Sequence, residues 1–264
     1  MADTGQPPLR VAVVGASAGL GRCIGTGLAH RGAHVALLAR RYDRLVEAAK
    51  DAGNGAVAVA CDVTATDACQ KAMSEVIDAL GGLDALVYTT GMGVLAPLRE
   101  MTAEQWAQLF ATNVTGASLV TAAAAPHLAA SAGSAVYLSS LSASYTTPWP
   151  LLGAYAVTKG ALDKLVEAWR IEHPEIGFTR LAVGDSLGGS GDAQTEFNKS
   201  WDPDALESAI KFWMENKYML GGLVGAEHLT EVVHSVIRCG NSSFIPSLTL
   251  APRASDAVKE LRQW

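Results

Sequence analysis

Short apolar segments alternate with helical segments along most of the chain, and this alternation limits the choice of fold. Apolar runs of strand length occur at 9–14, 34–38, 56–60, 83–88, 135–138, 178–183 and 244–250. Helical segments are expected between them, among others at 42–52, 66–80, 104–130 and 227–238. Strands that alternate with helices form a mostly parallel sheet with right-handed crossovers. We therefore expect an α/β fold with a doubly wound, mostly parallel sheet of about seven strands.

The chain is expected to form one domain. Its 264 residues, 49% of them hydrophobic, allow a sizeable core, and no linker-like stretch divides them. Residues 1–8 are polar with two prolines and are predicted to be a loose tail, so the domain would comprise 9–264. Residues 184–220 are first rich in Gly and Ser, then amphipathic and aromatic. They are predicted to form a lid over a substrate, although a peripheral helix that packs aromatic residues is the alternative.

Composition favours a small-molecule role in the cytoplasm. The formal charge of -6, with no block of like charge, argues against a nucleic-acid partner or an anionic membrane surface. Neither a signal peptide nor an apolar run of membrane-spanning length is visible, so a cytoplasmic location is expected. The four cysteines show no CxxC pairing. We expect all four to pack as small hydrophobes and expect no metal site.

A glycine cluster follows the first expected strand and begins the first expected helix. Strand, glycine turn and helix in this order are the context that a dinucleotide phosphate loop requires. Gly15 permits a tight turn, and Gly19 and Gly21 permit close approach of the backbone to a pyrophosphate. Ser17 and Leu20 belong to the same loop. All five residues are therefore predicted to bind the cofactor.

Two arginines, Arg40 and Arg41, end the second expected strand. An acid at this position would bind the adenosine 2′-hydroxyl, whereas Arg accommodates a 2′-phosphate. The sequence therefore favours NADP(H) over NAD(H), although two arginines at a helix start also suit a solvated surface. Asp62 follows the third strand, at the edge where ligands of such sheets bind, but Asp is equally common there as a turn or cap residue.

Polar residues later in the chain suggest proton transfer. Tyr155 and Lys159 are four residues apart at the head of a helical run, which puts them on one helix face. A nearby cation favours the phenolate and lowers a tyrosine pKa toward the range of a general acid or base. Asn113 interrupts the helix expected at 104–130, which a Thr102–Gln105 capping box begins. Such an Asn is either tolerated on a solvated face or retained for a polar task.

Taken together, the chain resembles the short-chain dehydrogenase/reductase family from residue 9 to about 250. The matching features are Gly15-x-x-x-Gly19-x-Gly21, Asp62-Val63, Gly91, Asn113, a serine after the fifth strand and Tyr155-x-x-x-Lys159. The resemblance implies a Rossmann fold, hydride transfer between a nicotinamide cofactor and a carbonyl or alcohol, and a homodimer or homotetramer. Aromatic residues in 184–220 suggest a fairly apolar small-molecule substrate.

The resemblance also implies a role for each catalytic candidate. Tyr155 would be the general acid for carbonyl reduction and the base in the reverse direction. Lys159 would bind the nicotinamide ribose and lower the pKa of the tyrosine, and Asn113 would support a water chain to the lysine. A serine would hydrogen-bond the substrate oxygen. Ser140 best fits the strand end and is chosen, but Ser142 lies thirteen residues before the tyrosine, the commoner family separation.

Three segments depart from the family pattern, one of them the terminal strand, which lacks the usual Asp-Gly-Gly ending. The Asn-Asn-Ala-Gly after the fourth strand is replaced by the residues 88–91, Tyr-Thr-Thr-Gly. The sixth strand is followed by Gly184-Asp185 rather than Pro-Gly, with Ser186 and Ser190 as candidates for a missing threonine near the nicotinamide. Asp185 would add negative charge there. This departure motivates an alternative function, an NADP(H)-binding sensor or assembly protein without reductase turnover.

Overall fold

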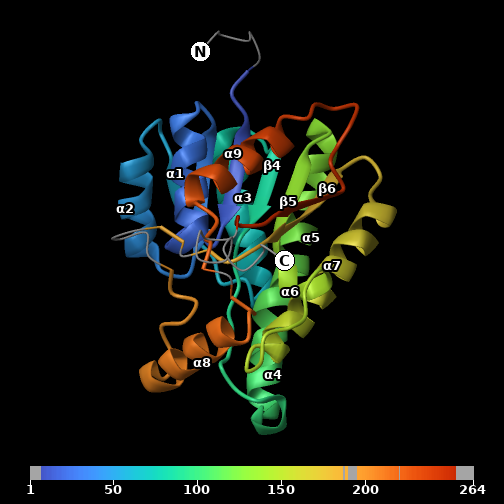
Figure 1. The fold of residues 1–264 in the computed structure, drawn as a ribbon. Helices are drawn as coiled ribbons and strands as arrows, with labels where there is room; N and C mark the ends of the chain where they lie inside the picture. Colours follow the sequence, from blue (N-terminus) through green and yellow to red (C-terminus); the bar gives the residue numbers. More distant parts are fainter. Residues whose placement is uncertain (1–6, 187, 190–194, 220, 254–264) are drawn as a thin grey trace.

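The computed structural model describes residues 7–186, 188–189, 195–219 and 221–253. The loose tail predicted for 1–8 therefore falls almost entirely outside the described residues, and the lid predicted for 184–220 falls partly outside them. The described residues form the predicted single layered α/β unit, with helices on both faces of one central sheet (Figure 1).

Seven parallel strands form the sheet in the spatial order β3-β2-β1-β4-β5-β6-β7. The strands are β1 (Arg10–Val14), β2 (His34–Ala39), β3 (Val57–Ala60), β4 (Ala85–Tyr88), β5 (Ser134–Ser140), β6 (Gly177–Val183) and β7 (Ser247–Leu250). The strand order reverses between β1 and β4. Ligands of open α/β sheets bind outside the carboxyl ends of the strands at such a point, so the fold itself indicates where a site lies.

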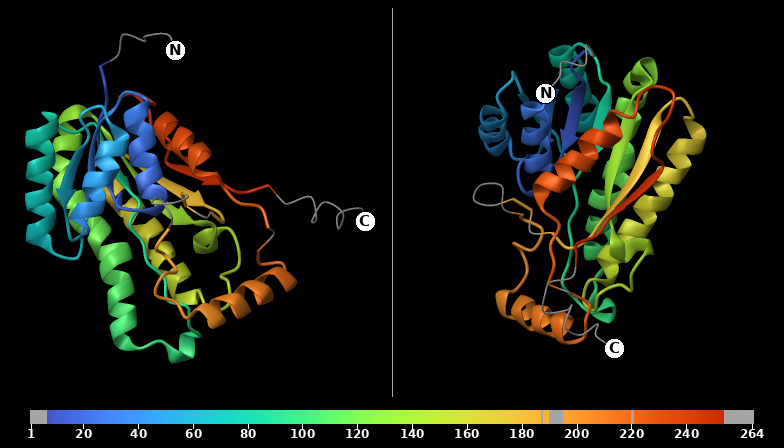
Figure 2. Two further views of the ribbon diagram at one scale, coloured as in Figure 1. Left: turned by 90° about the vertical axis from the view of Figure 1, so that its left-hand side faces the viewer. Right: turned by 45° about the horizontal axis from the view of Figure 1, so that its top comes forward.

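Three long helices cover each face of the sheet. One face carries α1 (Gly19–His30), α2 (Tyr42–Ala52) and α9 (Ala226–Ile237), and the other carries α3 (Thr66–Leu80), α5 (Gly116–Ser131) and α7 (Gly153–Glu172). Further helical elements are η1 (Leu98–Glu100), α4 (Ala103–Phe110), α6 (Leu141–Ser144) and α8 (Pro203–Glu215). The described chain begins at the end of the molecule opposite α4 and α8 (Figures 1 and 2). No helix in the described part combines the length and apolar character needed to cross a membrane.

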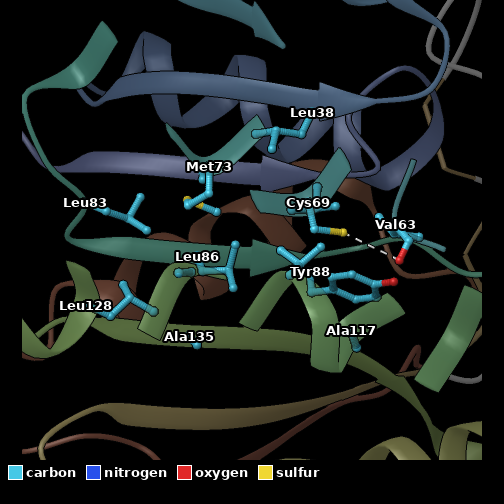
Figure 3. Close-up of a cluster of buried hydrophobic side chains, with 14 of the residues drawn as sticks. Leu38, Val63, Cys69, Met73, Leu83, Leu86, Tyr88, Ala117, Leu128 and Ala135 are labelled. Carbon is cyan, nitrogen blue, oxygen red and sulfur yellow. Dashed lines mark hydrogen bonds between the residues drawn. The ribbon is translucent and has the colours of Figure 1, made fainter. Parts of the chain in front are cut away.

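Alternate residues of the strands fill two separate cores. In β1, Ala12 and Val14 point to the core beneath α3 and α5, whereas Val11 and Val13 point to the core beneath α1 and α9. Figure 3 shows part of the first core, where Tyr88 lies among aliphatic side chains. Burial of both faces explains why the strands read as continuous apolar runs rather than as an alternation of apolar and polar residues.

The cysteine prediction is correct for the core and wrong at the surface. Cys61 and Cys69 are buried in the first core, and Cys23 is half-buried. Cys239 is exposed and directly follows Arg238, the C-cap of α9. An apolar neighbourhood in the sequence therefore did not guarantee burial at a helix end.

The helix expected at 104–130 is interrupted at the predicted position. The capping box is present, since Gln105 N donates to Thr102 Oγ1 and Thr102 N donates to Gln105 Oε1. Between α4 and α5 lies one π-helical turn, η2 (Ala111–Thr115), which contains Asn113. Such turns are frequent at functional sites. The last strand is shorter than expected and begins only after Pro246, which has no N–H for a sheet hydrogen bond.

Candidate active site

The glycine loop forms a tight turn between β1 and α1. Gly15 has φ +93°, and its N–H and that of Ala16 both donate to Leu38 O of β2, at 2.7 and 3.1 Å. A Cβ on Gly21 would lie 2.3 Å from Thr89 Oγ1 and 2.4 Å from Gly15 O, so only glycine fits there. Gly15 therefore needs glycine for the tight turn that the sequence suggested, whereas Gly21 needs it because α1 packs closely on Gly15 and Thr89.

Thr89 shows how the departure from the family pattern after β4 is accommodated. Its hydroxyl donates to Val14 O at 2.7 Å, and its N–H donates to the same oxygen at 2.9 Å. The threonine thus joins the ends of β1 and β4, immediately before the glycine loop. Gly91 follows, and a Cβ there would lie 3.3 Å from Lys159 Nζ.

The beginning of α1 suits an anion. The helix has no acidic residue in its first turn, and its N-cap, Ala18, provides no side-chain acceptor. The N-cap side chain therefore occupies none of its first N–H groups, and the helix dipole favours a phosphate there. Ser17 is buried in the loop before the helix, and Leu20 is half-buried in its first turn. The residues present fit the pyrophosphate of a dinucleotide.

Of the two arginines expected at the cationic end of the site, the structure joins Arg41 to the glycine loop. Arg41 Nη2 donates to Ser17 Oγ at 2.8 Å, which brings its guanidinium to the glycine loop. Arg40 is exposed. Arg44 was missed from the sequence, although it lies three residues after Arg41 in the first turn of α2. Both Arg41 and Arg44 form ion pairs with Glu196.

Asp62 acts as a turn residue, which was the alternative interpretation from the sequence. Its Oδ1 accepts hydrogen bonds from Thr64 N at 3.0 Å and Thr64 Oγ1 at 2.8 Å. These bonds, with a smaller contribution from the charge of Arg40, hold the pKa of Asp62 below its usual value. Val63 is buried, and its methyl groups face Gly116, where a Cβ would lie 2.8 Å away.

Asn113 lies fully buried at the centre of the polar cluster. Its Oδ1 accepts from Met92 N, and its Nδ2 donates to Met92 O and to Thr158 Oγ1, each at 2.9 Å. The amide therefore joins the loop after β4 to α7, one residue before Lys159. Of the two interpretations of this residue, the solvated face is excluded and a polar task remains.

Tyr155 and Lys159 lie on one face of α7, as predicted. Lys159 is 3% exposed, and its Nζ donates to Leu138 O of β5 at 2.7 Å. The same Nζ lies 5.7 Å from the centroid of the Tyr155 ring. Burial lowers the pKa of Lys159 to about 8, and the charge of Asp163 acts in the opposite direction.

The net pKa shift of Tyr155 is upward, opposite to the lowering that was expected from the neighbouring lysine. Burial raises the pKa of Tyr155 to about 12, and a hydrogen bond with the Ser140 side chain acts in the opposite direction. Loss of hydration disfavours the phenolate here, and the ammonium is bonded to Leu138 O. The tyrosine is therefore protonated at neutral pH.

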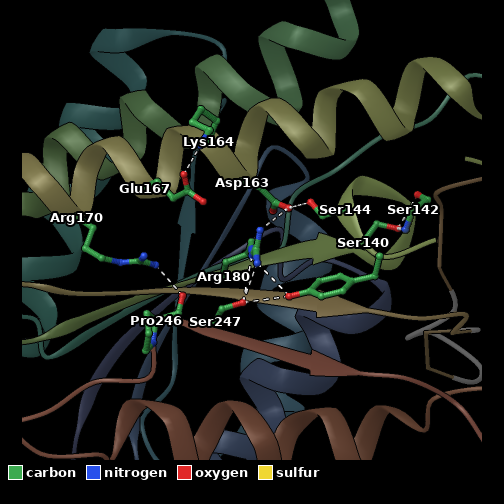
Figure 4. Close-up of polar contacts among 11 residues, drawn as sticks. Ser140, Ser142, Ser144, Asp163, Lys164, Glu167, Arg170, Arg180, Pro246 and Ser247 are labelled. Atoms are coloured by element: carbon green, nitrogen blue, oxygen red, sulfur yellow. Dashed lines mark hydrogen bonds and ion pairs between the residues drawn. The ribbon is translucent and has the colours of Figure 1, made fainter. Parts of the chain in front are cut away.

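Ser140 is the serine that contacts the phenol. It ends β5 and caps α6, and its Oγ accepts from Ser142 N at 3.3 Å and lies 3.0 Å from Ser142 Oγ (Figure 4). Ser142 thus lies one step behind Ser140 in the same hydrogen-bonded pair. The structure brings Tyr155, Ser140, Lys159 and Asn113 together at the ends of β4 and β5.

A buried ion pair supports α7 beyond Lys159. Asp163, 4% exposed, accepts from Ser144 Oγ at 2.9 Å and from Arg180 Nη1 at 3.3 Å (Figure 4). Arg180 also bonds to Tyr145 and Ser247, so it connects α6, α7 and β7. No sequence pattern predicted this network, because its members lie on four different elements.

The segment 195–201 lies across the site, within the stretch 184–220 where a lid was expected, although Phe197 was not singled out from the sequence. A Cβ on Gly19 would lie 3.4 Å from Thr195 Cα, so the segment rests on the glycine loop. The ring of Phe197 packs edge-on against that of Tyr155, with centroids 5.0 Å apart. Trp201 Nε1 donates to Gly93 O at 2.9 Å, and its ring packs on Phe197. Aromatic side chains thus cover the tyrosine.

The residues after β6 are only partly described. Ser186 Oγ accepts from Gly188 N at 3.2 Å, and Ser190, the other candidate for the missing threonine, lies outside the described residues. Asp185 is half-buried, and burial raises its pKa to about 6. Its backbone oxygen accepts from Val224 N at 2.7 Å, which ties the loop to the start of α9.

Comparison with known proteins gives a consistent result. Residues 10–186 match the family model described as short chain dehydrogenase. An 11-beta-hydroxysteroid dehydrogenase-like 3 protein of Arabidopsis thaliana is 35% identical over 180 residues, which are 66% of this chain and 58% of that protein. An uncharacterized oxidoreductase of Methylorubrum extorquens is 30% identical over 240 residues, 82% of this chain and 96% of the relative.

A solved structure shares the fold over nearly its full length. It is a metagenomic short-chain oxidoreductase in complex with NADP, with 25% identity, a TM-score of 0.71, and coverage of 93% of this chain and 97% of that one. The plant relative is longer than this chain, and the match spans little more than half of it. The resemblance to the solved structure and to the bacterial relative extends over almost the whole length of those proteins.

Proposed function

Because the chain belongs to the short-chain dehydrogenase/reductase family, we propose that it is an NADP(H)-dependent oxidoreductase that interconverts a carbonyl group and an alcohol. The observation that carries the proposal is the convergence of Tyr155, Ser140, Lys159 and Asn113 at the carboxyl ends of β4 and β5. A site that only bound a dinucleotide would need no hydroxyl pair beside a buried lysine.

The bound cofactor would supply the hydride to the carbonyl carbon. Negative charge then develops on the carbonyl oxygen, and the hydroxyls of Ser140 and Tyr155 stabilise it by hydrogen bonding. Tyr155 donates its proton to that oxygen. A pKa of about 12 keeps the phenol protonated at neutral pH, which is the form that carbonyl reduction needs.

Lys159 and Asn113 support this proton transfer. Lys159 shares a helix face with Tyr155, so its ammonium stabilises the phenolate that remains after proton donation. Asn113 fixes the loop at Met92 against Thr158, beside the lysine. The fully buried amide of Asn113 joins the loop after β4 to α7. This bond fixes the position of the lysine relative to the tyrosine.

Two observations support the finer parts of the proposal. Arg41 contacts the glycine loop and shares Glu196 with Arg44, and no acid ends β2, which favours a 2′-phosphate and hence NADP(H). Phe197 and Trp201 surround Tyr155 with aromatic surface, which favours a fairly apolar substrate. The name of the Arabidopsis relative, a hydroxysteroid dehydrogenase-like protein, agrees with such a substrate class.

The test is NADPH oxidation with a panel of ketones and the Tyr155→Phe variant. We expect turnover by the wild type and a loss of at least about 100-fold in the variant, the usual scale of general acid–base catalysis. Tyr42→Phe, which removes the hydroxyl of a tyrosine 50% exposed on α2, is the matched control. Turnover that survives in Tyr155→Phe would exclude this mechanism. NADPH binding without turnover on any ketone would favour a sensor or assembly function.

A further inference from the structure

One carboxylate neutralises both arginines at the cationic end of the site. Glu196 is ion-paired with Arg41, and its Oε1 lies 2.6 Å from Arg44 Nη1. Lys199 Nζ lies 3.5 Å from the same Oε1. Although burial acts to raise it, these cations hold the pKa of Glu196 below its usual value, so the carboxylate is charged at neutral pH.

The ion pairs join segments that are far apart in the sequence. Arg44 and Glu196 are 152 residues apart, on α2 and on the segment after β6. Arg41 also donates to Ser17, so one guanidinium contacts both the glycine loop and Glu196. Glu196 therefore lies where an anion bound beside the glycine loop would contact the same two guanidiniums.

The neighbours of Glu196 fix the carboxylate in this position. Thr195 packs on Gly19, and its Oγ1 accepts from Phe197 N at 3.2 Å. Phe197 packs on Tyr155, and Trp201 is bonded to Gly93. The segment is thus held on both sides of Glu196, and the carboxylate meets the arginines without a large loss of chain freedom.

We propose that Glu196 is a specificity-determining residue, whose carboxylate competes with a 2′-phosphate for the guanidiniums of Arg41 and Arg44. The proposal rests on the proposed use of NADP(H). A ligand that carries the 2′-phosphate must displace Glu196, whereas the same ligand without that phosphate need not. Glu196 therefore lowers the affinity for the phosphorylated ligand and narrows the discrimination between NADP(H) and NAD(H).

The expected size of the effect follows from the exposure of the pairs. The arginine side chains are 40% and 41% exposed and Glu196 is 25% exposed, so each pair is only partly screened by solvent. Each partly exposed ion pair contributes little free energy. Because a 2′-phosphate must displace Glu196 from two such pairs, we expect the carboxylate to weaken the affinity for the phosphorylated ligand by about tenfold.

The experiment compares two ligands that differ only by the phosphate in question, adenosine 2′,5′-bisphosphate and adenosine 5′-monophosphate. Their dissociation constants are measured by calorimetry for the full chain and for Glu196→Gln. We expect about tenfold tighter binding of the bisphosphate in the variant and little change for the monophosphate. Glu196→Asp, which keeps the charge, should retain the weaker binding. Glu47→Gln, which removes an exposed carboxylate of α2, should change neither constant.

Other outcomes overturn the inference and separate it from the proposed cofactor. Equal tightening of both ligands would mean that Glu196 restricts access without competing for the phosphate. Weaker bisphosphate binding would make the carboxylate part of the binding pocket. In both cases Arg41→Ala and Arg44→Ala would still weaken bisphosphate binding if NADP(H) is the cofactor. If these arginine variants leave bisphosphate binding unchanged, the proposed cofactor preference is wrong as well.

Discussion

The ring of Phe197 lies edge-on against the ring of Tyr155, with centroids 5.0 Å apart and planes inclined at 70°. The two residues come from segments that the sequence alone did not connect. Their contact contributes to the burial that raises the pKa of Tyr155 to about 12. The aromatic cover and the proton donor are therefore parts of one unit.

Replacing the cover should change the pH dependence of the reaction. In Phe197→Ala the phenol regains hydration, so we expect its pKa to fall from about 12 toward the ordinary value of roughly 10. Alcohol oxidation needs the phenolate, so its rate increases with pH as the phenol loses its proton. In the variant this increase should occur at lower pH. The measurement is the pH profile of kcat/KM, which reports the free enzyme. Phe197→Leu keeps an apolar cover and should shift this increase less; identical profiles for all three proteins would contradict the prediction.

Removing the buried amide should cost stability. Asn113→Ala removes three hydrogen bonds, two with the backbone groups of Met92 and one with the hydroxyl of Thr158, which keeps only its bond to Tyr155 O. We expect a loss of about 2–4 kcal/mol in the free energy of unfolding, measured by urea denaturation. Asn216→Ala, which removes an exposed hydrogen bond to Phe212 O, should cost less than about 0.5 kcal/mol. Equal losses in the two variants would show that burial of the amide is unimportant.

Two helical glycines should respond oppositely to alanine. In Gly21→Ala the new methyl group would meet Thr89 Oγ1 at 2.3 Å and Gly15 O at 2.4 Å, so we expect a loss of about 2–4 kcal/mol. In Gly160→Ala of α7 the nearest atom is Ala143 O at 3.7 Å, an ordinary contact. That variant should gain about 0.5–1 kcal/mol from reduced freedom of the unfolded chain. Thermal and urea unfolding of both variants measure the difference, and a destabilised Gly160→Ala would refute the argument.

Asp185 should make the stability depend on pH below neutrality. Its folded pKa of about 6 lies above the unfolded value, so its contribution is fully present below about pH 4 and is lost as pH rises to about 6. The Asp185→Asn variant has no carboxyl group at this position, so it does not lose this stability as pH rises. We therefore expect the variant to exceed the wild type by about 1–2 kcal/mol at pH 7.5 and to match it at pH 4, by urea unfolding at both pH values. A difference that is the same at both pH values would contradict the raised pKa.

The sequence by itself determined the order of strands and helices, the α7 face shared by Tyr155 and Lys159, and the glycine loop. The helices at Tyr42–Ala52 and Thr66–Leu80 have the bounds that were expected. Such features depend on residues that are close in the sequence, because strand and helix periodicity, capping and turn chemistry act locally. The interruption at Asn113 was located for the same reason, since an Asn within a helix competes for backbone hydrogen bonds.

Only the tertiary structure decided which distant residues meet. It paired Arg44 with Glu196, set Phe197 against Tyr155 and placed Ser140 rather than Ser142 beside the phenol. It also reversed the expected pKa shift of the tyrosine, because burial depends on every segment that packs over a group. Local periodicity carries no information on the path of a loop after a strand end. Contacts between loops, and the desolvation that they cause, therefore followed only from the folded chain.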